Sequence, residues 1–579
     1  LPTGPHGPSP MDLPLKLWIA RLANGVSPAS LAQAQIDWAV HMLASPTRQA
    51  ELAASATRKC AAWLQYLVRA LQGPCEKCIE PQPQDKRFSH REWQSLPFSA
   101  IAQAFLQQQQ WWAEATTGVR GVSRHHEEVT AFAARQWLDM WSPSNFIGTN
   151  PQVLKETLDT GGSNLVTGLA NWWQDALSLA GGSNKARGTE AFEPGRTVAI
   201  TPGRVVMRNH LIELMQYEPT TPEVEREVVL VFPSWIMKYY ILDLTPESSL
   251  VKFLVDQGHT VLMVSWRNPE AEDSLLCMDD YLELGVFEAI RATRELHPDA
   301  GIHAMGYCLG GTLLAMGAAL LGARGSHDLR TLTLLAAQVD FREPGELGLF
   351  VDESQIAFLE DLMAEHGYLD GRQMAGAFQL INSKDLVWSK LVHEYLMGAH
   401  TPMTALRAWN ADATRMPARM HSEYLRRLYL HNDLAEGRYR VHGHPVLIDE
   451  IRIPTFVVAT ERDHVSPWKS VYQLLRLARA PTYFVLASGG HNVGVVSPPS
   501  GPQSHPAAGF HEAHHAPRRA PTDPQQWLEE AQWQAGSWWP VWDQWLHRHS
   551  SGLVSARKPG GIKVQGQVVP APGTYVHQT

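Results

Sequence analysis

The chain contains few cysteines for its length. Only five of its 579 residues are cysteine, namely Cys60, Cys75, Cys78, Cys277 and Cys308. An odd and sparse set does not form the disulfide framework of a secreted domain, so we expect a reducing compartment. Cys75 and Cys78 form an isolated C-x-x-C motif without a second ligand pair at zinc-site spacing. We therefore interpret these two as ordinary loop cysteines.

Long apolar runs are also missing. The longest candidate, residues 313–321, is far shorter than the roughly 18 residues that a membrane helix needs. The first ten residues, LPTGPHGPSP, do not show the charged and then apolar pattern of a secretory signal. These two observations predict a cytoplasmic protein without a membrane span.

An excess of positive charge is missing as well. Lys and Arg number 49 against 58 Asp and Glu, which gives a formal net charge of −9 and argues against a nucleic-acid-binding protein. A local basic pocket for an anionic ligand remains compatible with this balance. Hydrophobic residues make up 44% and charged residues 18%, a mixture typical of globular proteins that bury a large core.

The pattern of apolar residues divides the chain into two predicted domains. Residues 11–195 read as mostly helical, with apolar side chains such as Leu31, Ile36 and Met42 at helical spacing. A Gly-rich linker is expected at residues 181–184. Residues 196–579 form the second predicted domain.

In the second domain, short apolar runs alternate with helical stretches. Strands are expected at residues 228–232, 261–265, 302–305, 331–336, 455–459 and 482–486. This alternation predicts a parallel sheet covered by helices on both faces. The helical segment at about residues 341–450 interrupts the pattern and predicts a cap over the carboxyl edge of the sheet. Residues 497–524 are expected to form a surface loop, and residues 527–545 a closing helix broken at Pro540.

The sequence Gly306-Tyr307-Cys308-Leu309-Gly310 carries the main functional signal. It is a G-x-C-x-G nucleophile elbow, lying between an expected strand and an expected helix as that motif requires. The helix N-terminus favours a thiolate at Cys308, and the N–H of Leu309 would form half of an oxyanion hole. These features predict an α/β-hydrolase fold with a cysteine nucleophile and a helical cap, preceded by a mostly helical N-terminal domain.

Partners for Cys308 occur in the order that this fold class uses. Asp463 follows the strand expected at 455–459, and His491 follows the strand expected at 482–486. His464 is a competing base, but it adjoins Asp463 and cannot easily receive the orienting bond of that carboxylate. The second oxyanion donor is expected in the loop after residues 228–232, and the N–H of Trp235 is the candidate.

Several longer segments resemble the polyhydroxyalkanoate synthases, and most closely the single-subunit class I type. The segments that carry the resemblance are KYYILDL at 238–244, VSWRNP at 264–269, GYCLGGT at 306–312, DLVW at 385–388, WNADAT at 409–414 and GSWWP at 536–540. The resemblance implies Cys308, His491 and Asp463 as catalytic residues and (R)-3-hydroxyacyl-CoA as substrate. It also implies a homodimer, a growing polyester chain and attachment to polyester granules. Trp409 is the candidate substrate-binding residue, since it falls where the family has a Trp associated with activity and dimerisation, although a packing role fits it equally well.

Two alternative functions remain open at this point. A thioesterase or polyester depolymerase would use the same triad, and a non-catalytic granule-associated scaffold would use the helical domain and the aromatic C-terminal segment. The sequence does not decide whether Asp463 acts directly as a base or only orients His491. It assigns neither the acyl chain length nor a role for the His-rich tract 505–515. No cofactor and no metal are expected.

Overall fold

The computed structural model describes residues 15–17, 25–73, 75–82, 85–180, 187–371, 373, 383–501, 504, 507–515 and 523–579. The first ten residues, the linker expected at 181–184 and His505 lie outside the described residues. The chain divides into two compact units. One, which we call the sheet unit, comprises Leu1–Leu22, Arg187–Ala375 and Met403–Thr579. The other, the helical unit, comprises Ala23–Ala186 and Gly376–Pro402.

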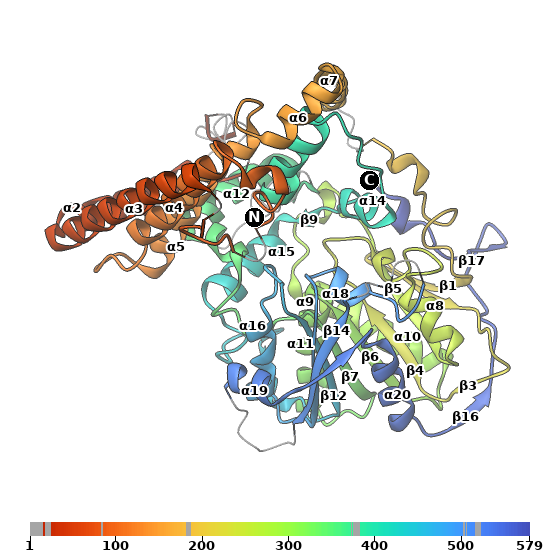
Figure 1. Ribbon diagram of the computed structural model, residues 1–579. Helices are drawn as coiled ribbons and strands as arrows, with labels where there is room; N and C mark the ends of the chain where they lie inside the picture. Colours follow the sequence, from red (N-terminus) through yellow and green to blue (C-terminus); the bar gives the residue numbers. More distant parts are fainter. Residues whose placement is uncertain are drawn as a thin grey trace. The chain divides into compact units, whose positions relative to one another are not determined.

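Within the described residues, ten strands of the sheet unit form one mixed sheet in the order β1-β2-β5-β4-β6-β7-β12-β13-β14-β15 (Figure 1). The strands are β1 Gly203–Arg208, β2 Ile212–Tyr217, β4 Val228–Phe232, β5 Thr260–Trp266, β6 Ile302–Tyr307, β7 Leu329–Leu335, β12 Thr455–Thr460, β13 Thr482–Ala487, β14 Gly509–His515 and β15 Gln532–Ala535. The centre, from β5 to β13, is parallel. Strands β4 and β6 are buried along their whole length, as expected for the centre of a sheet covered on both faces.

All six strands expected from the sequence are confirmed to within two residues at each end. The prediction of a wholly parallel sheet was wrong at its edges, because β2 runs antiparallel to β5 and β14 runs antiparallel to β13. The expected surface loop at 497–524 was also wrong for residues 509–515, which form β14. That strand contains three histidines and no β-branched residue, so the sequence shows little of the signal by which strands are recognised.

Helix α11, Leu309–Ala323, is the buried helix that follows the elbow. Every residue from Leu309 to Leu320 is buried, and the helix packs against β4, β6 and β7. A helix that is apolar all round belongs in a core. The first residue of α11 is thus held by packing on several sides, which fixes the position of Cys308 immediately before it.

The aromatic C-terminal segment differs from its prediction as a single helix. It forms α19, Pro524–Glu530, then β15, then α20, Trp539–His549. The first helix ends at Glu530 and not at Pro540, and Gly536, whose φ of +102° suits glycine, lies between β15 and α20. Pro540 instead stands in the first turn of α20, where a missing N–H costs no hydrogen bond.

The helical unit contains the helices expected in the N-terminal part of the chain. They are α2 Pro28–Leu43, α3 Pro46–Gln72, α4 Phe98–Thr116, α5 Arg124–Met140, α6 Pro151–Asp159 and α7 Ser163–Ala180. A later segment with the helical turns η8, Lys384–Trp388, and η9, Leu391–Leu396, packs in the same unit. The Nδ2 atom of Asn164 on α7 donates to the carbonyl of Leu396 at 2.8 Å, and Lys390 pairs with Asp175 at 2.6 Å. The range 341–450 expected as a cap is therefore shared between the two units.

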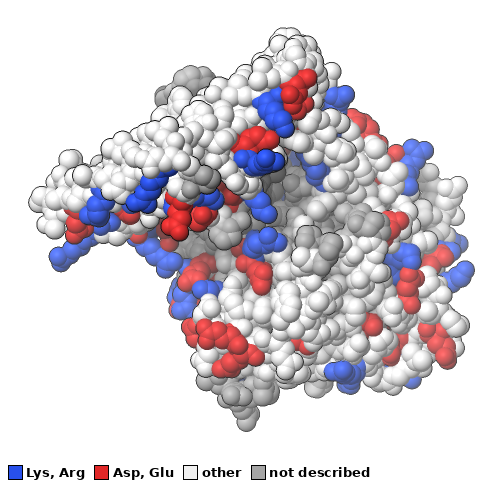
Figure 2. Space-filling model, in the orientation of Figure 1, with Lys and Arg blue, Asp and Glu red and all other residues white. Residues whose placement is uncertain are grey.

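In the sheet unit, the rest of that range forms α12 Glu353–His366, α14 Ala405–Ala411, α15 Ala418–Glu423 and the π-helical turn η10 Tyr424–Leu430. No helix in the described part of the chain has the length and hydropathy that crossing a membrane requires. On the face shown in Figure 2, Lys and Arg side chains are interspersed with Asp and Glu side chains.

Candidate active site

Cys308 occupies a sharp turn between β6 and α11. Its φ of 53° and ψ of −126° lie in a region that residues other than glycine rarely adopt. This strained conformation is typical of a nucleophile elbow, which the sequence predicted at this position. The side chain is 8% exposed, so the thiol lies in largely buried surroundings.

Glycines make the turn sterically possible. A Cβ atom at Gly310 would lie 2.3 Å from the carbonyl oxygen of Pro233 and 2.4 Å from that of Phe232. A Cβ atom at Gly306 would lie 2.4 Å from the Cα atom of Gly311. The elbow therefore packs directly against the backbone at the end of β4, the strand from whose following loop the second oxyanion donor is expected.

The structure brings Asp463 and His491 together. Asp463 follows β12, His491 follows β13, and the Nδ1 atom of His491 lies 2.7 Å from Oδ2 of Asp463. The other carboxylate oxygen of Asp463 accepts the backbone N–H groups of Val465 at 2.9 Å and Ser466 at 2.8 Å. Thr460 donates its hydroxyl to Oδ2 at 3.1 Å. Burial alone would raise the pKa of Asp463, but the charge of His491 and these hydrogen bonds hold the pKa below its ordinary value.

Cys308 lies within electrostatic range of His491, so the three residues come together at one site. Burial alone would lower the pKa of His491, whose side chain is 15% exposed. The charges of Asp463 and Cys308, together with the hydrogen bonds to both, nevertheless raise the pKa of His491 well above its ordinary value.

Tyr307 lies at the site, although no role was predicted for it from the sequence. Its ring stacks on the imidazole of His491, with centroids 5.6 Å apart and planes 29° apart. Its hydroxyl donates to Oδ1 of Asn492 at 2.6 Å. Burial raises the pKa of Tyr307, and the charges of Cys308 and Asp463 add to this effect. The only sequence signal for this role was its position next to Cys308 in the elbow.

The loop after β4 is fixed beside the elbow by contacts to its backbone. Trp266 donates its indole N–H to the carbonyl of Pro233 at 2.9 Å, and Thr414 donates its hydroxyl to the carbonyl of Trp235 at 2.9 Å. Leu309 begins α11, and the N–H groups of a first helical turn have no acceptor within their own helix. The assignment of the Leu309 and Trp235 N–H groups to an oxyanion hole stays a prediction.

Trp409 and His464 make contacts of other kinds. The buried indole of Trp409 donates to the carbonyl of Lys238 at 2.7 Å, a packing contact to the end of the loop after β4. Its expected role toward the substrate stays a prediction. The carbonyl of His464 accepts the backbone N–H of Glu346 at 3.1 Å, whereas the carboxylate of Asp463 is bonded to His491.

Two tyrosines of the cap region lie within electrostatic range of the thiol of Cys308. Burial raises the pKa of Tyr424 and Tyr429, and the charge of Cys308 raises both further, so all three lie within electrostatic range of one another. The hydroxyl of Tyr424 donates to that of Tyr429 at 3.0 Å, and Phe341 packs on Tyr429 with ring centroids 4.9 Å apart. Burial also lowers the pKa of His421 to about 4. No periodic pattern in the sequence marked these residues, because they come together only through the fold of the cap.

Cys75 and Cys78 are free thiols in the helical unit. They face the carbonyl oxygens of Tyr66 and Ala62, which belong to α3.

Three family models match the chain. Residues 84–254 match the "Poly-beta-hydroxybutyrate polymerase (PhaC) N-terminus", and residues 6–48 match the "Poly-beta-hydroxybutyrate polymerase N terminal" model. Residues 227–498 match the alpha/beta hydrolase fold.

Curated proteins resemble nearly the whole chain. A poly(3-hydroxyalkanoate) polymerase of Methylorubrum extorquens is 40% identical over 519 residues, which cover 89% of this chain and 84% of that protein. The poly(3-hydroxyalkanoate) polymerase subunit PhaC of Cupriavidus necator is 37% identical over 500 residues, covering 85% and 83%. Among solved structures, a soluble variant of monoglyceride lipase from Saccharomyces cerevisiae has a TM-score of 0.37 at 10% identity, covering 60% of this chain and 97% of that one.

Proposed function

Because the chain belongs to the poly(3-hydroxyalkanoate) polymerase family, we propose that it polymerises (R)-3-hydroxyacyl-CoA into polyhydroxyalkanoate through an acyl-enzyme on Cys308. One observation carries the mechanistic part of this proposal. The thiol of Cys308, at the strained elbow, is connected through His491 to the buried carboxylate of Asp463. This is the arrangement that activates a nucleophile in acyl transfer.

In the first half of the cycle, Cys308 is acylated. His491 takes the thiol proton, and the thiolate attacks the carbonyl carbon of the substrate thioester. The N–H groups of Leu309 and Trp235 stabilise the negative oxygen of the tetrahedral intermediate. The bond to the CoA sulfur then breaks, and His491 returns the proton so that CoA leaves as a thiol.

In the second half, the hydroxyl of another hydroxyacyl unit attacks the Cys308 thioester. An ester bond forms, the bond to the Cys308 sulfur breaks, and the hydroxyl proton passes to His491 and then to the departing thiolate. Both oxygens of Asp463 already accept hydrogen bonds, from His491 and Thr460 on one side and from two backbone N–H groups on the other. These bonds support a role for Asp463 in orienting His491 rather than acting as the base.

Exclusion of water favours polymerisation over hydrolysis of the acyl-enzyme. Cys308 is largely buried, and the aromatic residues Phe341, Tyr424 and Tyr429 of the cap region are buried as well. Such surroundings favour a polymerase over the thioesterase or depolymerase that the same triad could serve.

The proposal includes a homodimer and attachment to polyester granules. Trp172 and Trp173 on α7 have exposed side chains, and apolar groups of this kind suit contact with an apolar polyester. Sedimentation of the purified chain with and without substrate tests the dimer, and co-sedimentation with polymer tests the attachment.

The central experiment supplies the full chain with (R)-3-hydroxybutyryl-CoA and, in parallel, with longer hydroxyacyl-CoA substrates. Free thiol, insoluble polymer and free hydroxy acid are measured together. A polymerase incorporates one hydroxyacyl unit into polyester for nearly every CoA that it releases, so the mass of polymer matches the free thiol. Stoichiometric free acid without polymer would identify a hydrolase, and no CoA release from any substrate would point to the scaffold function.

A further inference from the structure

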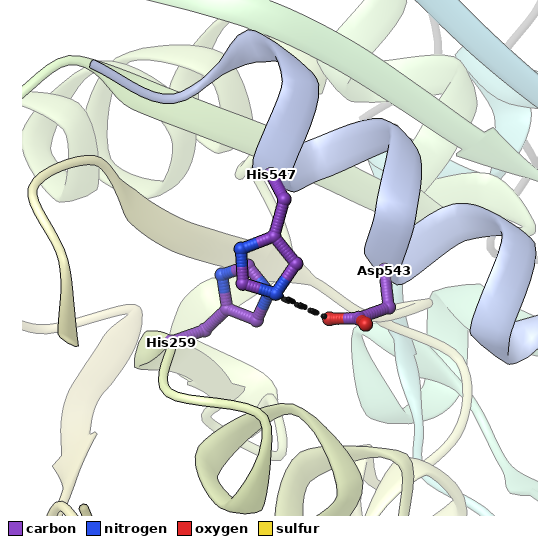
Figure 3. A group of neighbouring side chains, drawn as sticks. All are labelled: His259, Asp543 and His547. Atoms are coloured by element: carbon purple, nitrogen blue, oxygen red, sulfur yellow. Dashed lines mark hydrogen bonds and ion pairs between the residues drawn. The ribbon is translucent and has the colours of Figure 1, made fainter. Parts of the chain in front are cut away.

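A second group of polar side chains lies in the sheet unit away from Cys308. His259, Asp543 and His547 each offer one ligand atom, and these atoms all lie within 4.8 Å of one another. Figure 3 shows both imidazole rings beside the Asp543 carboxylate, with Asp543 and His547 one turn apart on α20. His259 comes from the loop directly before β5.

This group lies at the amino-terminal ends of the parallel strands, whereas the active site lies at their carboxyl-terminal ends. His259 precedes β5, and Glu225, which contacts His547, precedes β4. Cys308 follows β6, and these three strands are parallel. The length of a six-residue strand separates the two ends by roughly 20 Å at about 3.3 Å per residue. The group therefore takes no part in the acyl transfer proposed for Cys308.

We propose that His259, Asp543 and His547 bind a divalent transition-metal ion, with Zn²⁺ as the best match. The Nε2 atoms of His259 and His547 lie 2.9 Å and 3.3 Å from the same oxygen, Oδ1 of Asp543. Ligand atoms about 2.0–2.1 Å from a tetrahedral zinc ion are about 3.3 Å apart. The three side chains thus already stand near the spacing that the ion requires, and a water molecule would complete the coordination.

The surroundings of His547 supply a second, independent observation. Its Nδ1 atom lies 2.5 Å from Oε1 of Glu225, while its Nε2 atom faces Asp543. With Zn²⁺ bound at Nε2, Glu225 would orient the ring from outside through Nδ1, as carboxylates do for metal-bound histidines.

The hydrogen bonds of the nearby histidines indicate why His259 and His547, and not the others, are the proposed ligands. His259 has no exposed side-chain surface, and among the described residues its Nδ1 atom has no hydrogen-bond partner. Both nitrogens of the neighbouring His303 are engaged, Nδ1 with Thr331 at 2.8 Å and Nε2 with Ser550 at 3.1 Å. His549, also on α20, bonds through Nδ1 to the carbonyl of Trp545 at 2.8 Å.

A bound ion would join two distant parts of the chain. His259 and Asp543 are 284 residues apart in sequence, and the ion would fasten α20 to the loop that leads into β5. A ligand that binds only the folded state stabilises it in proportion to the logarithm of its concentration over its dissociation constant. We therefore assign the ion a structural role.

The test compares chelator-treated wild type, His547→Gln and the matched control His549→Gln. Each is titrated with Zn²⁺ against a chromogenic chelator, and thermal unfolding is recorded with and without Zn²⁺. Wild type and His549→Gln are each expected to bind one more equivalent of Zn²⁺ tightly than His547→Gln does. Their Tm is expected to rise by several degrees when Zn²⁺ is present. The affinity at this site should fall roughly 100-fold or more in His547→Gln, because even loss of an outer partner costs about 10–100-fold. Glu225→Gln should lose about 10-fold.

Other histidines, and the thiol of Cys308, also bind zinc weakly, so the difference between variants is the measured quantity. Co²⁺ separates the sites further, because a nitrogen–oxygen site lacks the thiolate-to-cobalt charge-transfer band. Should His547→Gln fail to fold, the isosteric Asp543→Asn takes its place in the same comparison. Equal Zn²⁺ stoichiometry and equal gain in Tm for wild type and the ligand variant would overturn the proposal. So would a stability difference that follows pH and is insensitive to Zn²⁺, since the cation at His547 would then be a proton.

Discussion

The phenol ring of Tyr307 lies stacked on the imidazole of His491, and the Tyr307 hydroxyl holds the next residue, Asn492, through a 2.6 Å hydrogen bond. The residue before Cys308 thus fixes the loop that carries His491. The strand that presents Cys308 and the loop that presents His491 are tied together by a contact that leaves both reacting atoms free.

Tyr307→Phe tests this positioning role. The ring stays stacked but the hydrogen bond to Asn492 is lost, which costs about 1 kcal/mol. We expect kcat for CoA release to fall roughly 3- to 10-fold with KM nearly unchanged, because a misplaced base slows chemistry and leaves substrate binding intact. Tyr483→Phe is the control, since Tyr483 bonds to Glu512 elsewhere on β13 and β14. A change in KM alone would contradict the positioning role.

Cys308→Ala removes the proposed nucleophile. CoA release from (R)-3-hydroxybutyryl-CoA should fall by roughly 1,000-fold or more, the scale seen when the nucleophile of a triad is lost. The variant should unfold at nearly the temperature of wild type, because the substitution removes one sulfur atom and keeps the backbone. Thiol release and a thermal melt are measured on the same preparation. Retained activity would show that another group carries the acyl chain.

Asp463→Asn keeps the shape of the side chain and removes its charge. The amide no longer stabilises the imidazolium of His491 or fixes its tautomer, so kcat should drop by roughly 1,000- to 10,000-fold. Asp449→Asn is the control, because Asp449 pairs with the exposed Arg479 in a surface contact. If Asp463→Asn stayed within a few-fold of wild type, the acid of the triad would have to be sought elsewhere.

The raised pKa of His491 predicts a pH-dependent stability. A group whose pKa is higher in the folded state stabilises the fold fully below its unfolded pKa, about 6.5, and loses this contribution as pH rises through the folded value. The difference in Tm between wild type and His491→Gln should therefore be largest near pH 6 and should shrink steadily above pH 6.5. Thermal melts from pH 5.5 to 9 measure it. A difference that grows with pH would mean that folding lowers the pKa of His491 instead of raising it.

Gly310→Ala tests the packing of the elbow. The added Cβ atom would lie 2.3–2.4 Å from two backbone carbonyl oxygens, which cannot move without disturbing β4. Overpacking of this kind costs about 1–3 kcal/mol or more, so we expect a clearly lower Tm and loss of CoA release. Gly560→Ala is the matched control, because a Cβ atom there meets nothing within 4 Å. Equal melting temperatures for both variants would show that the elbow can accommodate a Cβ atom at residue 310, contrary to this prediction.

The central strands were predictable because their physical signal is local. Val228–Phe232 and Thr455–Thr460 are short runs of apolar, mostly β-branched residues bounded by polar segments, and burial on both faces requires such runs. The proposed triad was located from the sequence for a related reason. Cys308, Asp463 and His491 each lie within a few residues of the end of a strand, so finding the strands also located these residues.

The edge strands of the sheet and the fold of the cap could not be predicted in this way. Strand β14 is rich in histidine and has a single large apolar residue, Phe510, and it forms because β13 offers a free edge for pairing. Tyr424 and Tyr429 approach Cys308 only after some hundred intervening residues have folded. The division of residues 341–450 between two units likewise depends on packing partners such as Asn164, far away in sequence.

That division has a consequence for synthesis on the ribosome. The last segment of the helical unit to be translated is Gly376–Pro402, whereas most of the unit, Ala23–Ala186, is translated earlier. At about 5–20 residues per second, the intervening stretch takes roughly 10–40 s to translate. During that interval Asn164 and Asp175 on α7 lack the partners that Leu396 and Lys390 later provide. A fragment that ends before residue 376 therefore lacks the segment that pairs with Asn164 and Asp175 in the complete helical unit.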